Sequence, residues 1–254
     1  MEKEIISVMK RYELKYHLNK EQVIFFKEKI LDYMKIDKYG LTTIGSIYFD
    51  TPNYYLIRKS IEKPLFKEKI RLRSYGIANE DSPVFLEVKR KNEKIVYKRR
   101  IVTTEAKAEK FFNKNEEFDS KQISRELLAF KETYEVLEPK YLIIYDRIAY
   151  YQDDSDVRIT LDMNPRYRVE DLNLHTSTKG IPLLEDGEAI LEVKVQNSVP
   201  LWLVDILTKG KIFKTSFSKV GTAHTKEMNR KINKEKIIKQ PINIKGGYQY
   251  GIII

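Results

Sequence analysis

The sequence lacks cysteine entirely and contains only three histidines among its 254 residues. Without cysteine the chain can form no disulfide bond, no thiolate metal site and no cysteine nucleophile. Three histidines do not favour a histidine-rich metal site. No stretch approaches the roughly 18 apolar residues of a membrane-spanning helix, and the first residues lack the apolar core of a signal peptide. These absences predict a cytoplasmic protein without a transmembrane segment.

Positive charge is in excess, because 47 lysines and arginines stand against 37 aspartates and glutamates, which gives a formal net charge of +10. Such an excess favours a polyanionic partner, which could be nucleic acid, anionic lipid, a nucleotide or an inorganic phosphate chain. Nothing resembles a helix-turn-helix, a zinc finger or an RNA-recognition motif, so we expect no nucleic-acid partner. The basic surface could also dock on anionic lipid or a membrane-protein partner, although a solvated surface is the simpler interpretation.

The segment from Phe66 to Gly76 has the strongest charge pattern in the chain. The two-residue period of a strand places four cations on one face and a carboxylate with two apolar residues on the other. The cations are Lys67, Lys69, Arg71 and Arg73, and the opposite residues are Glu68, Ile70 and Leu72. Four neighbouring cations repel one another unless water or a polyanion lies between them.

Similar alternation of ionic and apolar residues predicts about eight strands, joined by helices. Further strands are expected at residues 8–18, 42–50, 83–91, 94–103, 139–151, 155–163 and 188–196, and helices after Asn19 and at 53–62, 104–133, 201–208 and 219–233. The helices carry apolar residues that must cover the apolar strand faces, so the ionic faces turn inward. We therefore predict an α+β fold in which a curved antiparallel sheet closes into a polar tunnel with helices packed outside. An open sheet with one basic face is the alternative.

The domain prediction is a single unit over residues 1–233, followed by a tail at 234–254 that is either a terminal strand or disordered. A lumen crowded with lysine and arginine needs bound anions, and a metal ion, to balance its charge. This requirement follows from the inward orientation of the ionic faces.

Several motifs together resemble the vacuolar transporter chaperone (VTC) domain, the polyphosphate-polymerase branch of the triphosphate tunnel (CYTH-like) superfamily. They are Arg11-x-Glu13-x-Lys15-Tyr16, Ser46-Ile47-Tyr48-Phe49-Asp50-Thr51-Pro52, Lys69-Ile70-Arg71-Leu72-Arg73-Ser74-Tyr75, Leu-Glu-Val-Lys at 86–89 and at 191–194, Tyr145-Asp146-Arg147 and Phe217-Ser218-Lys219. The similarity extends from about residue 8 to about residue 230.

The resemblance implies an eight-stranded tunnel that transfers the terminal phosphoryl group of ATP to a growing inorganic polyphosphate chain, with Mn²⁺ or Mg²⁺ as cofactor. It also implies that phosphate is bound by Lys15, Arg71, Arg73, Lys89, Lys98, Arg147, Arg158 and Lys219. Tyr145 and Ser218 would be hydrogen-bonding partners, and Glu192 would be the metal carboxylate. A salt bridge to a neighbouring strand is the alternative for Glu192.

Arg100 and Lys194 are further candidates for substrate binding, since they share strand faces with Lys98 and Glu192. Lys98 and Arg100 could equally line a rim. We expect Glu13 and Glu87 to orient nearby cations rather than to hold metal.

Two departures from the superfamily pattern bear on the reaction. Superfamily hydrolases carry Glu-x-Glu-x-Lys on the first strand, whereas this chain has Arg11 in place of the first glutamate, which favours the polymerase branch. Polymerase relatives tend to have a lysine before Phe-Ser-Lys, where this chain has Ser216, with Lys214 two residues earlier. Three hypotheses follow: a polyphosphate polymerase, a metal-dependent triphosphatase acting on ATP or tripolyphosphate, and a polyphosphate-binding module without turnover.

Overall fold

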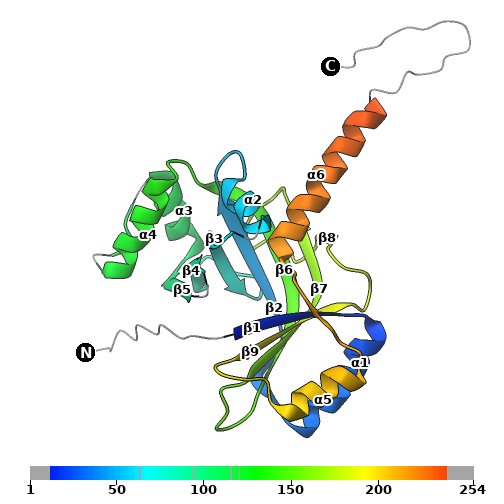
Figure 1. Ribbon diagram of the computed structural model, residues 1–254. Coiled ribbons are helices and arrows are strands. Elements are labelled where there is room, and N and C mark those ends of the chain that lie inside the picture. Colours follow the sequence, from blue (N-terminus) through cyan, green and yellow to red (C-terminus); the bar gives the residue numbers. More distant parts are fainter. Residues whose placement is uncertain (1–11, 63, 94, 115, 120, 239–254) are drawn as a thin grey trace, which may run out of the picture.

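The computed structural model describes residues 12–62, 64–93, 95–114, 116–119 and 121–238. Its centre is an antiparallel sheet of ten strands (Figure 1). Nine of them follow the order β10-β1-β9-β7-β6-β2-β3-β4-β5, and the tenth, β8, pairs with β7. The strands are β1 (Tyr12–Leu18), β2 (Lys35–Asp50), β3 (Phe66–Tyr75), β4 (Val84–Asn92), β5 (Ile95–Thr103), β6 (Glu138–Tyr151), β7 (Arg158–Arg168), β8 (Ile181–Pro182), β9 (Ala189–Val195) and β10 (Lys214–Thr215).

The sheet is open, so the predicted closed eight-stranded barrel is wrong. Among the described residues, the end strands β10 and β5 do not pair with each other. The strand count also differs, because β8 and β10 have two residues each and are too short to show a two-residue period. Closure requires backbone hydrogen bonds between the end strands, and the side-chain pattern does not encode these bonds.

The open sheet is strongly curled. Glu13 on β1 and Lys89 on β4 lie 3.4 Å apart, although five strands separate β1 from β4 in the sheet. Neighbouring strands are about 4.8 Å apart, so a flat sheet would separate β1 from β4 by roughly 29 Å. The sheet therefore curls until side chains of β1 and β4 meet on its inner face, which we define as the face that carries Lys15, Arg71 and Arg147.

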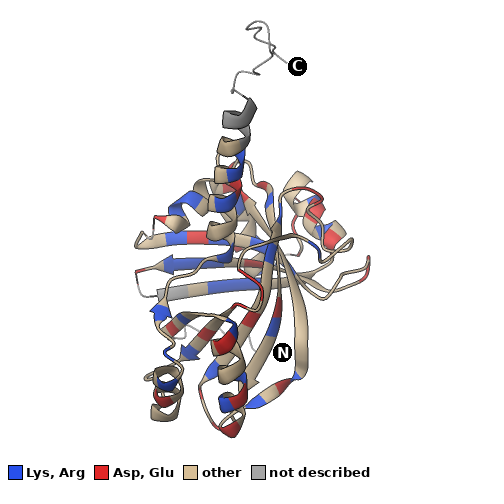
Figure 2. Cartoon of the chain, turned by 90° about the vertical axis from the view of Figure 1, so that its right-hand side faces the viewer, with Lys and Arg blue, Asp and Glu red and all other residues tan. Residues whose placement is uncertain are grey.

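Strand β3 alternates as its sequence predicts. Glu68, Ile70 and Leu72 are buried on the outer face, and Ile70 is completely inaccessible. Lys69 and Arg71 are half-buried on the inner face. Figure 2 shows bands of lysine and arginine, with acidic bands between them, on neighbouring strands of the sheet.

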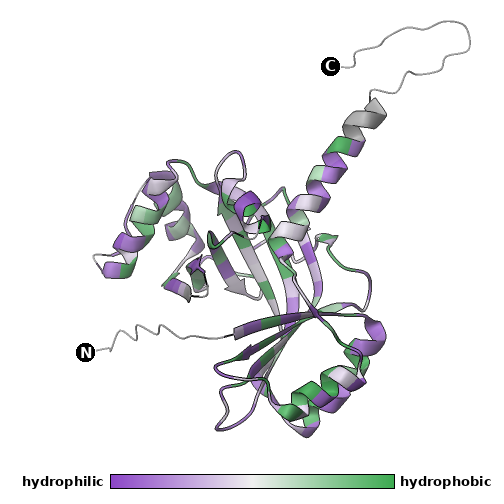
Figure 3. Cartoon of the chain, in the orientation of Figure 1, coloured by the Kyte–Doolittle hydropathy of each residue, from purple (hydrophilic) through white to green (hydrophobic). Residues whose placement is uncertain are grey.

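Two helix pairs cover the outer face of the sheet (Figures 1 and 3). One pair packs Phe26, Ile30 and Leu203 against β1, β7 and β9, and each such buried side chain contributes about 1.5–3 kcal/mol. The other pair packs Phe111 and Phe130 against β3, β4 and β6. The first pair is α1 (Lys20–Lys29), followed by the 3-10 turn η1 (Ile30–Asp32), with α5 (Leu201–Lys209), and the second is α3 (Glu105–Lys114) with α4 (Gln122–Thr133).

Helix α1 begins directly after Asn19, as the sequence predicts, and Asn19 caps it. The Asn19 side chain accepts a hydrogen bond from the backbone N–H of Gln22, and the Gln22 side chain accepts one from the backbone N–H of Asn19. This reciprocal capping box satisfies two backbone donors that the helix itself leaves unpaired.

The two remaining helices, α2 (Tyr55–Ile61) and α6 (Lys219–Ile238), close one end of the inner face. Ile57 of α2 packs with Val220 and Ala223 of α6 against inner-face residues of β2 and β6, including Tyr48 and Ile143. The inner face therefore has an apolar end under these helices, and the ionic residues occupy the rest of it.

Helix α6 continues beyond its predicted end near residue 233 and runs to Ile238, projecting from the body of the molecule (Figure 1). The rest of the predicted tail, residues 239–254, lies outside the described residues, as does Arg11. None of the described helices is long and apolar enough to cross a membrane.

Candidate functional site

Ten cations and four carboxylates of the described residues lie on the inner face, and we call them the ionic cluster. Their ion pairs form two networks, one around Glu87 and one around Glu192, and the Tyr145 side chain contacts cations of both. Each carboxylate contacts at least two cations, and the ten cations outnumber the four carboxylates that neutralise them. The cations are Lys15, Lys69, Arg71, Arg73, Lys89, Lys98, Arg100, Arg147, Lys194 and Lys219, and the carboxylates are Glu13, Glu87, Asp162 and Glu192.

Arg71 is held between a carboxylate and a phenol. Its Nε donates to Glu87 Oε2 at 2.9 Å, and its Nη1 donates to the Tyr48 hydroxyl at 3.0 Å. Burial opposes ionisation of Tyr48, but the positive charges of Arg71, Lys69 and Arg73 outweigh it and lower the pKa of Tyr48 to about 7. A phenol becomes this acidic only where positive charge is concentrated.

Arg73 is buried and donates from Nε to Ser46 Oγ and from Nη2 to the Tyr145 hydroxyl, both at 3.1 Å. The Tyr145 ring also lies near two other cations, with Lys219 Nζ 4.6 Å and the Arg147 guanidinium 5.1 Å from its centroid. Tyr145 therefore joins cations from β3, β6 and α6 around one aromatic side chain.

Glu87 is the carboxylate that orients the β3–β5 side of the cluster. It is 2% exposed and contacts Arg71, Lys98 at 2.7 Å and Arg100 at 3.4 Å, with Arg73 at 4.0 Å. Burial raises the pKa of Glu87, but the surrounding cations, Arg71 first, outweigh this effect and lower it to about 2. Glu87 is therefore ionised at all physiological pH values.

Glu192 has the corresponding position on the β1–β9 side. Its carboxylate contacts Lys15 at 3.1 Å, Lys194 at 3.3 Å, and both Arg147 and Lys219 at 3.8 Å. Burial opposes its ionisation, yet these cations hold its pKa well below the usual value. In this structure Glu192 therefore forms ion pairs, which was the alternative to metal binding. Metal binding by Glu192 stays a prediction.

Lys219, at the start of α6, brings a cation from outside the sheet. It contacts Asp162, which also accepts hydrogen bonds from Nε and Nη2 of Arg147. Asp162 is completely buried, and its pKa is lowered because the attraction of Lys219 and Arg147 exceeds the cost of burial.

Lys69 differs from the other cations of the cluster because none of the ion pairs among the described residues includes it. Its Nζ donates to Ser218 Oγ at 3.2 Å, and Lys15 Nζ donates to the carbonyl of Phe217 at 3.3 Å. Burial and the repulsion of lysines such as Lys15 and Lys89 lower the pKa of Lys69 to about 8. An anion bound beside Lys69 would relieve this repulsion.

Arg158 is the predicted phosphate ligand that the structure does not bring into the cluster. Its guanidinium donates to the backbone carbonyls of Ser155 and Val157 at 3.3 and 3.2 Å, at the exposed start of β7. The other predicted site residues either belong to the ionic cluster or, like Tyr145 and Ser218, contact it.

Three residues of the site were not among the predicted site residues: Tyr48, Lys69 and Asp162. The signal for Tyr48 and Lys69 was present, since both lie on ionic strand faces within the motifs described above. Asp162 shares a strand face with Arg158, but its role depends on Lys219, which is 57 residues away in the sequence.

No three potential metal ligands from His, Asp and Glu gather in the part of the chain that the structure describes. The best-placed pair is Glu13 and Glu192, because the ammonium group of Lys15 lies between them, at 3.3 and 3.1 Å. Mg²⁺ and Mn²⁺ take oxygen ligands, and one or two carboxylates with substrate phosphates suffice for Mg²⁺. The donor set fits a metal that arrives with a phosphate ligand.

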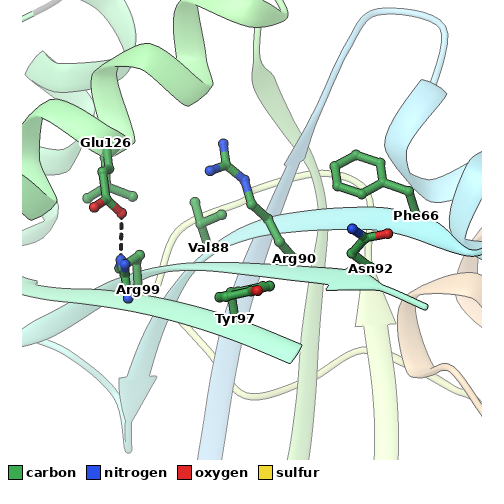
Figure 4. Close-up of a pocket in the computed structure, with 8 residues that line it drawn as sticks. Phe66, Val88, Arg90, Asn92, Tyr97, Arg99 and Glu126 are labelled. Carbon is green, nitrogen blue, oxygen red and sulfur yellow. Dashed lines mark hydrogen bonds and ion pairs between the residues drawn. The ribbon is translucent and has the colours of Figure 1, made fainter. Parts of the chain in front are cut away.

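A second group of arginines lines a cavity of about 280 Å³ on the outer face, between α4 and the β4–β5 hairpin (Figure 4). Here each arginine has its own carboxylate, since Arg99 pairs with Glu126 and Arg90 with Glu68. This outer pocket is therefore close to charge-neutral, and we do not assign it to a polyanion.

The structure thus has a curled, open antiparallel sheet whose inner face carries the ionic cluster. The model of the VTC domain family matches residues 10–226. The chain therefore belongs to the VTC domain family, and the resemblance found in the sequence is confirmed.

Comparison with known proteins gives the fold further support. None of the curated protein sequences matches the chain. A candidate adenylate cyclase from Bacillus halodurans has a TM-score of 0.53 and 13% identity, over 83% of this chain and 96% of that chain. A candidate adenylyl cyclase from Hippeastrum, described as having a dominant triphosphatase activity, has a TM-score of 0.49 and 12% identity, over 84% of this chain and 94% of that chain. At this identity the first likeness concerns the fold alone.

Proposed function

We propose that this VTC domain protein is a polyphosphate polymerase that transfers the terminal phosphoryl group of ATP to a growing polyphosphate chain on the inner face. The observation that carries the proposal is the surplus of cations in the ionic cluster, above all Lys69, a half-buried lysine among other lysines that belongs to none of the ion pairs among the described residues. Such a surface is costly without a bound polyanion.

The proposed chemistry needs no protein nucleophile. A terminal oxygen of the polyphosphate chain attacks the γ-phosphorus of ATP, the bond from that phosphorus to the β–γ bridging oxygen breaks, and ADP leaves with the electron pair. Phosphoryl transfer depends mainly on alignment and on positive charge around the transferred group. The absence of a Ser–His or Cys–His pair from the cluster is consistent with this reaction.

The arginines and lysines of the cluster can bind phosphate in different ways, because arginine presents a planar fork of N–H groups and lysine a single point charge. Arg71 and Arg73 are already oriented by Glu87 and Tyr145, so their remaining N–H groups can bind two phosphate oxygens each. Lys69 supplies a mobile charge beside them on β3, and Lys15 and Lys219 supply mobile charges from the opposite side of the curled sheet. The two sides together could hold a phosphate chain along the inner face.

A divalent cation, when bound, would add positive charge at the reacting phosphates. Glu192 would hold it together with Glu13, a residue that the sequence pattern favours only for orienting cations. Displacement of the Lys15 ammonium from between these carboxylates would leave Lys15 to pair with phosphate. The VTC resemblance implies Mn²⁺ or Mg²⁺, and the oxygen donors suit either ion.

One incubation tests the proposal against its two alternatives. The protein is incubated with γ-labelled ATP and Mn²⁺ or Mg²⁺, and the products are separated on a gel. A polymerase yields a labelled long polymer and ADP, a triphosphatase yields labelled orthophosphate without polymer, and a binding module yields neither product. Orthophosphate as the only labelled product would replace the proposal with the triphosphatase.

A further inference from the structure

A half-exposed aromatic group lies beside the ionic cluster, at the end of β3 and the start of β4. Tyr75 and Phe85 pack edge to face with their ring centroids 5.5 Å apart. The guanidinium of Arg100 lies over the Phe85 ring, 3.6 Å from its centroid, and its Nη2 donates to the Tyr75 hydroxyl at 3.4 Å. We call these three side chains the aromatic platform.

The platform belongs to the inner face and adjoins the proposed phosphate ligands. Phe85 is the direct cross-strand partner of Arg73, and Tyr75 follows Arg73 by two residues on the same strand face. Residues two apart along a strand are about 6.6 Å apart. Tyr75 of the platform is thus about 6.6 Å along the strand from Arg73, which is about the length of a ribose.

The platform is open to a ligand, unlike the aromatic residues under α2 and α6. Tyr75 is 49% exposed and Val102, the cross-strand partner of Phe85, is 62% exposed. Strand β5 is an end strand of the sheet, so no further described strand covers this side. Arg100 Nε lies 3.4 Å from Glu87 Oε1, and this contact holds the guanidinium in place over Phe85.

We infer that the aromatic platform binds the base of the nucleoside triphosphate donor, an inference that rests on the proposed function. Bases stack on aromatic rings and on arginine guanidinium planes, at about 1–3 kcal/mol per base. A polyphosphate chain has no group that would use such a surface. The platform therefore selects the donor and places its base at the β5 edge, with its phosphates directed toward Arg73 and Arg71.

The test compares two ligands that share a triphosphate but differ in the base. Affinities for ATP and for inorganic tripolyphosphate are measured by titration calorimetry at one Mg²⁺ concentration, for wild type, Tyr75→Leu and Phe85→Leu. We expect each substitution to weaken ATP binding at least fivefold and to change tripolyphosphate binding less than twofold. Melting temperatures identify any variant with impaired folding, and Tyr75→Leu, at a half-exposed position, is the safer of the two.

Tyr97→Leu is the matched control, because Tyr97 is an exposed tyrosine on the outer face of the same hairpin. It should leave both affinities unchanged. Equal loss of ATP and tripolyphosphate affinity in Tyr75→Leu, or no loss of either, would overturn the inference. If wild type makes polymer while Tyr75→Leu retains full ATP affinity, only the platform fails. If wild type binds neither ligand, the proposed function fails with it.

Discussion

The inner and outer faces of β3, β4 and β5 carry the same kinds of side chain in different proportions. On the outer face Arg90 and Arg99 each have a carboxylate, Glu68 and Glu126, from β3 and α4. On the inner face Glu87 alone serves three arginines and a lysine, which are Arg71, Arg73, Arg100 and Lys98. Lys69 has no carboxylate at all among the described ion pairs.

Charge balance distinguishes these faces better than the presence of arginine does. A matched pair such as Arg99–Glu126 satisfies its own charges and needs no ligand, as structural ion pairs generally do. The inner face instead has more cations than carboxylates. The charges of these oriented cations stay uncompensated until an anion binds. The comparison supports our proposal that a polyanion binds on the inner face, although the outer pocket also contains two arginines.

The largest effect is expected from removing the inner arginines. The double variant Arg71→Ala, Arg73→Ala should lower the rate of polymer synthesis at least 100-fold, because each forked contact to a developing charge contributes about 2.7–4 kcal/mol. The measurement is the initial rate of labelled polymer formation per folded molecule. The matched double variant Arg90→Ala, Arg99→Ala on the outer face should stay within threefold of wild type. Full activity of the inner variant would refute the site assignment.

The next largest effect concerns the carboxylate at the centre of the β1–β9 side. Glu192→Gln should lower polymer synthesis about 10- to 100-fold and raise the metal concentration needed for half-maximal rate, since a neutral amide binds divalent cations poorly. Asp146→Asn is the control, because Asp146 pairs with Arg166 away from the ionic cluster. A reduced rate with an unchanged metal requirement would leave Glu192 as an ion-pairing residue only.

A smaller effect is expected from pH. The pKa values of Tyr48 and Lys69 lie at about 7 and about 8, so the inner face loses positive charge as the pH rises from about 6.5 to 9. Tripolyphosphate affinity should fall over this window, and the fall should be shallower in Tyr48→Phe and in Lys69→Met than in wild type. Equal slopes in calorimetric titrations of all three proteins would contradict this assignment.

The stability of the protein should rise over the pH range in which its affinity for tripolyphosphate falls. Both folded-state pKa values lie below the ordinary values of 10.0 and 10.5, so the unfolded chain binds more protons between about pH 7 and pH 10. The free energy of unfolding of the ligand-free protein should therefore rise through this window as far as these groups determine it. Urea titrations of wild type and Lys69→Met at pH 7 and pH 9 check the sign.

The smallest effect belongs to the outer face. Arg99→Ala removes a partly exposed ion pair with Glu126 and should lower the free energy of unfolding by about 0–1 kcal/mol. Arg90→Ala should cost more, about 1–3 kcal/mol, because it leaves the carboxylate of Glu68 buried without its cation. Chemical denaturation of the two variants measures this difference, and equal losses would show that burial of Glu68 does not matter.

Several elements of the fold were predictable because their signals are local. The alternation on β3 and the start of a helix after Asn19 depend on residues within a few positions of one another, and both predictions are confirmed. The motifs identified the VTC family for the same reason, since each one is a short run within or beside a single strand or, for Phe217-Ser218-Lys219, at the start of α6. The two-residue strands β8 and β10 gave no such signal.

The amino-acid sequence by itself determined which side chains share a strand face, because the two-residue period follows from backbone geometry alone. Only the tertiary structure decided that the sheet stays open, that Lys219 reaches Asp162, and that Arg158 turns to its own backbone. These outcomes depend on how far the sheet curls and where α6 packs. Curl and packing are sums of many weak contacts between distant residues, which no local pattern specifies.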